Sequence, residues 1–152
     1  MIKILKSPTA DTRTCDVKEV TKEQLKNSSY LHIADVRAAM AFFQESLMKA
    51  AEIHDHTKIS GLDRFYNDFK TEFKEHTWYD WHKKSERHHI ADKDGLKSDV
   101  DLIDVLEYIA DCVMAGMARS GDVYDLELPN EVLQKAFKNT VGKLKEEVSI
   151  DE

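Results

Sequence analysis

The spacing of apolar and polar residues along the chain predicts a protein built almost entirely of helices. Between residues 29 and 53, apolar side chains recur every three or four positions, and no Gly or Pro interrupts them. This is the period of an α-helix that buries one face. Three later segments share the pattern: residues 62–74, 102–119 and 129–149. In the last of these, Leu133, Phe137 and Val141 form the stripe that is expected to be buried.

Boundary residues refine this picture. Thr21 and Gln24 have the spacing of a capping box, which predicts a short helix over residues 21–27. Ser98 and Asp101 have a similar spacing and predict the start of another helix. The weak alternation of residues 2–5 predicts one short strand.

Composition supports a single all-α domain. The chain has 152 residues and a mass of 17.5 kDa, which fits one domain of average size. With only 5 Gly and 2 Pro, turn-rich β architectures are poorly supported. We therefore expect a helical bundle of about five to seven helices. Residues 1–28 would form an N-terminal arm with a short helix, residues 29–119 the core, and residues 129–149 the C-terminal helix.

Charge narrows the classes of partner. The 22 basic and 29 acidic residues give a net charge of −7, which argues against a protein that coats nucleic acid. No apolar run approaches the roughly 18 residues of a membrane span, and the N-terminus does not resemble a signal peptide. The two cysteines, Cys15 and Cys112, are too few for a disulfide scaffold. A cytoplasmic location without a membrane partner is the expectation, and the oligomeric state, homo-oligomers included, stays open.

The histidines are the most unusual feature, because all 7 lie between His32 and His89. His54 and Asp55 form an adjacent pair at the end of the apolar segment, and imidazole with carboxylate is a common ligand set for divalent metals. In an unbroken helix His32 would lie about 33 Å from His54, at ~1.5 Å per residue. If the two share a site, the helix must turn back, and residues 44–46 are the best candidate for a break.

Further candidate ligands follow along the chain. Asp111 lies on a mostly apolar helical segment, where a carboxylate is costly unless it is paired or metal-bound. Glu107 precedes it by one turn and shares its face. His82 and His89 are seven positions apart, as on one face of a helix, and His88 adjoins His89. For these three histidines, metal ligation, substrate contact and a solvated surface remain open, whereas His56 and His76 are expected at the surface.

The order of these residues resembles the HD-domain superfamily of metal-dependent phosphohydrolases, especially small phage and prophage proteins of that type. The resemblance covers roughly residues 7–119 and rests on four elements of the sequence. These are His32, then His54-Asp55 followed by Lys58, then Trp81-His82 with His88-His89, then Glu107 with Asp111. The gap from His32 to His54 is shorter than in many HD domains.

The resemblance implies a function and a role for each residue. One divalent ion (Mn, Mg, Fe, Co, Ni or Zn) would be held by His32, His54, Asp55 and Asp111. His82, His88 and His89 are candidate ligands of a second ion that Asp55 would share, and His82 could instead contact substrate. Glu107 would orient a ligand histidine, and Asp55 and Lys58 would take part in catalysis.

The substrate is expected to be a small nucleotide, attacked by water that the metal activates. Lys58 would face its phosphate, although a solvated lysine is equally consistent with the sequence. Arg13, in a loop rich in hydroxyl side chains, would be a second phosphate contact or would pair with a nearby acid. Two other hypotheses are kept: a non-catalytic module that binds a nucleotide or a protein, and a metal that only stabilises the helices.

Overall fold

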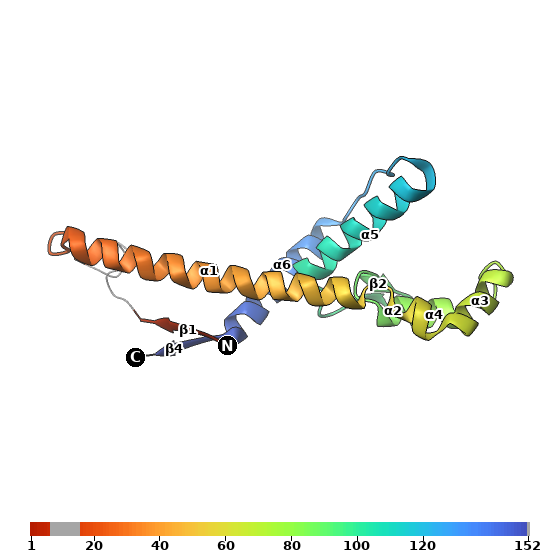
Figure 1. The fold of residues 1–152 in the computed structure, drawn as a ribbon, viewed down its shortest axis with the longest axis horizontal. Coiled ribbons are helices and arrows are strands. Elements are labelled where there is room, and N and C mark those ends of the chain that lie inside the picture. The colour runs from red at the N-terminus through yellow and green to blue at the C-terminus, as the bar shows by residue number, and fades with distance from the viewer. Residues whose placement is uncertain (7–15, 152) are drawn as a thin grey trace. The chain divides into compact units, whose positions relative to one another are not determined.

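The chain is mostly helical, as the apolar spacing predicts (Figure 1). A computed structural model describes residues 1–6 and 16–151. Arg13 and Cys15 lie outside the described residues, so the prediction for Arg13 stays a prediction. The helices are α1 (Lys22–Ile53), α2 (His56–Ser60), α3 (Leu62–Lys70), α4 (Thr77–Ser85), α5 (Leu102–Ser120) and α6 (Asn130–Glu147). The strands are β1 (Ile2–Leu5), β2 (Ala91–Asp92), β3 (Gly95–Leu96) and β4 (Val148–Asp151).

The chain divides into two compact units. Unit 1 comprises Met1–Glu45 and Gly142–Glu152, and unit 2 comprises Ser46–Val141. Among the described residues, no helix is both long enough and apolar enough to cross a membrane.

In unit 1 the two ends of the chain pair with each other. β1 and β4 are parallel, with Ile2 opposite Val148 (Figure 1), and the N-terminal amino group lies 2.9 Å from the Glu147 carboxylate. The expected strand at residues 2–5 is therefore present. The C-terminal helix ends at Glu147 rather than at residue 149, because the following residues join this small sheet.

α1 is a single helix, so the expected break at residues 44–46 is wrong. Gln44, Glu45 and Ser46 include neither Gly nor Pro, and nothing in the local sequence forces the helix to end there. The capping box is confirmed: the Thr21 amide donates to Gln24 Oε1 at 2.9 Å, and the Gln24 amide donates to Thr21 Oγ1 at 3.2 Å. It opens this long helix, instead of a separate short one.

Aromatic side chains form the centre of unit 2. Trp78 is buried and stacks on Phe65, with ring centroids 4.1 Å apart, and on His82, with centroids 4.5 Å apart. Gly61 brings α2 and α3 close to α4, since a Cβ at that position would lie 2.6 Å from the Trp81 ring. Trp78 is therefore a core residue, and Trp81 is half-buried beside it.

α4 begins beneath a buried carboxylate from the preceding helix. Asp68 accepts hydrogen bonds from Thr77 Oγ1 at 2.8 Å, from the Trp78 amide at 2.7 Å and from the Tyr79 amide at 3.1 Å. Burial alone would raise the pKa of Asp68, but these hydrogen bonds outweigh it and lower the pKa below its usual value. The ionised carboxylate satisfies amide donors that the first turn of α4 leaves free.

Replacing Asp68 by asparagine is expected to destabilise the fold at neutral pH. Because the folded pKa is lowered, ionised Asp68 stabilises the protein above the usual carboxyl pKa, and this contribution is lost as the pH falls through the folded value. The difference in urea midpoint between wild type and Asp68→Asn should therefore be largest near neutral pH and should shrink near pH 3. Asp63→Asn, on the exposed side of the same helix, is the control. A difference that is equal at both pH values would contradict this account.

α5 begins at a capping box formed by Asp101 and Asp104, three residues later than the box of Ser98 and Asp101 that the sequence predicts. Its N-cap is Asp101, whose carboxylate accepts from the Asp104 amide at 3.0 Å, whereas Asp104 accepts from the Asp101 amide at 2.9 Å. Ser98, the expected first residue of this box, lies outside it. Arg87 also binds Asp104, with its Nε 2.9 Å from Oδ1, and so attaches the segment after α4 to the start of α5.

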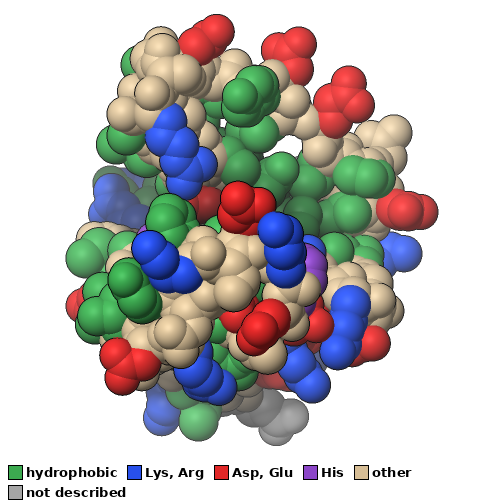
Figure 2. Space-filling view, turned by 90° about the vertical axis from the view of Figure 1, so that its right-hand side faces the viewer, with side chains coloured by type: hydrophobic (Ala, Val, Ile, Leu, Met, Phe, Trp, Pro, Cys, Tyr) green, Lys and Arg blue, Asp and Glu red, His purple; other side chains and the backbone are tan. Residues whose placement is uncertain are grey.

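Several apolar side chains of unit 2 lie at the surface. α3 exposes Leu62, Tyr66 and Phe69, and Figure 2 shows a face of the molecule on which hydrophobic side chains lie between acidic and basic ones. The buried face of α6 differs from the expected stripe: Leu133, Phe137 and Val141 are exposed. The buried residues of this helix are Val132, Ala136 and Thr140.

Candidate metal centre

His54 and Asp55 lie at the junction between α1 and α2. α1 ends at Ile53, and Asp55 adopts a left-handed backbone conformation with φ 55°, which aspartate tolerates better than most residues. Because the helix has ended, the two side chains are not held on diverging helical directions. His54 Nε2 lies 3.5 Å from Asp55 Oδ2, so the adjacent pair can serve one site.

Glu107 on α5 holds two histidine rings. Its Oε1 lies 2.9 Å from His54 Nδ1 and 3.2 Å from His88 Nδ1. Since a carboxylate can only accept, both Nδ1 atoms carry the proton, and in the neutral rings Nε2 keeps its lone pair. Burial alone would raise the pKa of Glu107, but the bonds from His88 and His54 lower it. Glu107 thus has the geometry expected for orienting a ligand histidine.

The Nε2 atoms of His54 and His88 both face the carboxylate of Asp55, and that of His54 also faces the carboxylate of Asp111 on α5. His54 Nε2 also lies 3.6 Å from Asp111 Oδ1, and His88 Nε2 lies 3.7 Å from Asp55 Oδ1. His82 Nε2 lies 3.6 Å from the same Asp55 oxygen. Asp55 Oδ1 is buried and has no hydrogen-bond partner among the described residues. A buried, unpaired carboxylate oxygen is costly unless another group neutralises it.

The second oxygen of Asp55 faces a cation. Lys58 Nζ, one turn along in α2, forms an ion pair with Oδ2. Burial would raise the pKa of Asp55, but the hydrogen bond and charge of Lys58, with the charges of His54 and His88, lower it. The carboxylate is therefore ionised and presents its two oxygens to different sets of neighbours.

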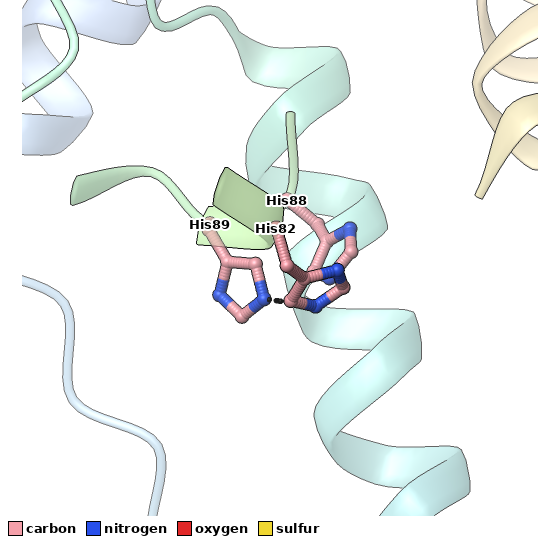
Figure 3. A group of neighbouring side chains, drawn as sticks. All are labelled: His82, His88 and His89. Carbon is pink, nitrogen blue, oxygen red and sulfur yellow. Dashed lines mark hydrogen bonds between the residues drawn. The ribbon is translucent and has the colours of Figure 1, made fainter. Parts of the chain in front are cut away.

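Three histidines form a cluster (Figure 3), and two of them, His82 and His88, face Asp55. His82 comes from α4, and His88 and His89 come from the segment that follows it. One nitrogen from each ring can be chosen so that all three lie within 4.8 Å of one another. Figure 3 shows the ring of His89 pointing at that of His82, with the two Nε2 atoms 2.9 Å apart. α4 ends at Ser85, so the expectation that His82 and His89 share one helical face is wrong: a loop brings them together.

A buried pair that sequence reasoning missed fixes the orientation of His82. Thr57 Oγ1 contacts both the Glu86 carboxylate and His82 Nδ1, the latter at 2.7 Å. Thr57 has one hydroxyl hydrogen and Glu86 can only accept, so the hydroxyl donates to Glu86 and accepts from His82 Nδ1–H. The Nε2 atom of His82 then holds the lone pair of the ring and accepts a hydrogen bond from His89 Nε2–H, a bond that metal binding would replace. Only the position of Thr57 between His56 and Lys58 could have drawn attention to it.

The charge state of two of the three histidine rings, His82 and His89, also suits metal binding. Burial, together with the charges of His88 and His82, lowers the pKa of His89 to about 3. Burial likewise lowers the pKa of His82. For His88, burial would lower the pKa, but Glu107 raises it. Neutral imidazole is the form that binds metals, and His82 and His89 hold it at neutral pH.

These residues fit a divalent ion. The separations of 3.5–3.7 Å between Nε2 and carboxylate oxygens are too long for hydrogen bonds. Ligand atoms that share an ion at about 2.0–2.2 Å are themselves about 3–3.5 Å apart, only slightly closer than here. Within the described part of the chain, two overlapping groups could hold a metal: His54 with Asp55 and His88, and His82 with His88 and His89. His88 has one free nitrogen, so it serves one ion at a time.

The structure brings together most of the predicted site residues. The residues that come together are His54, Asp55, Lys58, His82, His88, His89, Glu107 and Asp111. His32 is exposed on the unit 1 part of α1, and the helical break that would have returned it toward His54 is missing. His56 is exposed, as expected, although its Nδ1 lies 3.1 Å from Glu86 Oε1. His76 is also exposed, at the start of α4.

A pocket adjoins the site within unit 2. It has a volume of about 490 Å³, and His54, Lys58, Glu107 and Asp111 form one part of its lining. Most of its remaining lining is apolar. A pocket of this volume is in the range that binds small molecules.

Comparison of the chain with protein-family models, with curated proteins and with solved structures gave no match.

Proposed function

We propose that this chain is an HD-type, metal-dependent phosphohydrolase that acts on a small nucleotide. The observation that carries the proposal is the Asp55 carboxylate, because one of its oxygens faces His54 and Lys58 and the other faces His82 and His88. A carboxylate in this position can be shared by two metal ions. A site that only stabilised the fold would need four ligands and no more, whereas this cluster offers additional ones.

The residues of the chain divide the work of the proposed reaction. His54, Asp55 and Asp111 would hold one ion, and His82, His88 and His89 a second one beside the buried oxygen of Asp55. A divalent ion bound there supplies a water of lowered pKa and neutralises charge on a phosphoryl group. Lys58 is half-exposed and adjoins the pocket, so its ammonium can approach a phosphate oxygen while it stays near Asp55.

The test is a screen for released phosphate. The purified chain is incubated with nucleoside monophosphates, triphosphates and cyclic dinucleotides in the presence of Mn²⁺, Mg²⁺, Co²⁺ or Ni²⁺. We expect hydrolysis of at least one class that stops when a chelator is added. Metal binding without release of phosphate or nucleotide from any substrate would contradict the enzyme and favour a binding module. Unfolding by the chelator alone would indicate a structural metal.

A further inference from the structure

The pocket beside the metal centre has two chemically different ends. At one end lie His54, Lys58 and Asp111, and at the other lies Arg119, near the C-terminus of α5. Asp111 and Arg119 are two helical turns apart on α5, a rise of ~12 Å at about 1.5 Å per residue. This span is too long for a bare phosphate but is one that a single nucleoside phosphate can bridge.

The walls between these ends are apolar and consist largely of small side chains. The last turns of α1 contribute Ala50 and Ala51, and α5 contributes Ala110, Met114 and Ala115. Alanine leaves room that a larger residue would fill, and a methionine side chain adapts to flat or irregular partners. A phosphate or sugar gains little from such walls, whereas an aromatic base can bury its faces against them.

Arg119 indicates which chemical groups a ligand would present at the end of the pocket away from the metal centre. A basic residue in the last turn of a helix is common, because the helix dipole favours it. Here, however, Arg119 also lines the pocket, and its side chain forms no ion pair or hydrogen bond with another described residue. Its guanidinium has five N–H donors and no acceptor. A matching group therefore presents two neighbouring acceptors, as O6 and N7 of guanine do, whereas adenine presents one acceptor and one donor.

We propose that this pocket binds the base of a 6-oxopurine nucleoside phosphate such as GMP, with the base between α1 and α5 and its O6/N7 edge on Arg119. The assignment of the phosphate to the Lys58 end rests on the proposed function. Binding of the base rests only on the apolar walls and on Arg119. The two parts can therefore fail separately.

The first experiment measures binding without turnover. GMP, AMP and inorganic phosphate are titrated calorimetrically into the chelator-treated protein. We expect GMP to bind about tenfold more tightly than AMP, because each good bidentate contact discriminates to about that extent. Arg119→Gln should reverse the order, since glutamine offers the donor and acceptor that adenine matches. Arg37→Gln, at an exposed arginine of unit 1, is the control and should leave the order unchanged.

A second variant tests whether the base lies between the apolar walls of the pocket. Ala115→Leu narrows the pocket and should weaken GMP at least tenfold while leaving any binding of inorganic phosphate unchanged. Ala118→Leu, on the same helix but outside the lining, should have no effect. Equal affinity for GMP and AMP in wild type and in Arg119→Gln would overturn the inference, even if the protein hydrolyses nucleotides. Binding of GMP that depends on Arg119, without any hydrolysis, would support it and contradict the proposed enzyme.

Discussion

Asp55→Asn is expected to reduce turnover of the best nucleotide substrate by about 10³-fold or more, which corresponds to ~4 kcal/mol of lost transition-state stabilisation. Asparagine retains one oxygen but loses the negative charge that faces His54 and Lys58 on one side and His82 and His88 on the other. The new NH₂ group would also place hydrogen-bond donors against either His54 and Lys58 or His82 and His88. Asparagine tolerates the left-handed backbone of this position, so the fold should persist.

Steady-state rates of phosphate release with saturating Mn²⁺ measure this effect. Circular dichroism and the thermal midpoint show whether the variant is folded. Asp94→Asn is the matched control, since Asp94 is exposed in the turn between β2 and β3 of the same unit. A folded Asp55→Asn protein with turnover within tenfold of wild type would show that Asp55 is not the shared ligand.

Removing the carboxylate of Glu107 should weaken metal binding about 10–100-fold, the range found when partners of metal ligands are replaced. Glu107 holds His54 and His88 through the same oxygen, so one substitution frees two rings. Glu107→Ala should therefore show the larger loss. Glu107→Gln should show a smaller one, because it keeps the oxygen that both Nδ1 atoms contact.

The measurement is the Mn²⁺ affinity of the chelator-treated protein, determined at a fixed pH for both variants and for Glu127→Gln, an exposed loop residue. Thermal unfolding without metal separates a loss of fold from a loss of ligand orientation. If both Glu107 variants bind Mn²⁺ as wild type does, the histidines do not depend on this carboxylate.

Local patterns in the sequence predict the helices well but not their connections. The apolar spacing gives α5 almost to the residue, and Gly121 ends it with a φ of 73°. The strand β4 is missed because its partner β1 is at the opposite end of the chain, and pairing between distant segments leaves no local pattern. The predicted break in α1 is wrong because no helix-breaking residue supports it, and only a site shared by His32 and His54 would require it.

In the candidate site, too, residue type and local position can be predicted from the sequence, whereas contacts between distant segments cannot. His54, Asp55, Glu107 and Asp111 can be selected from residue type and position, and the structure places the three carboxylates around the ring of His54. The role of Thr57 and Glu86 cannot be selected in this way, because it depends on a three-dimensional contact between α2 and the end of α4. Likewise, Arg119 becomes notable only once the pocket is seen.

In the proposed site Asp55 joins two metal ions, and a calorimetric titration of the chelator-treated chain with Mn²⁺ tests this most directly. We expect binding of two ions per chain, one more tightly than the other, and loss of both in Asp55→Asn with no loss in Asp94→Asn. Absence of binding at millimolar Mn²⁺, or identical binding by wild type and Asp55→Asn, would contradict it.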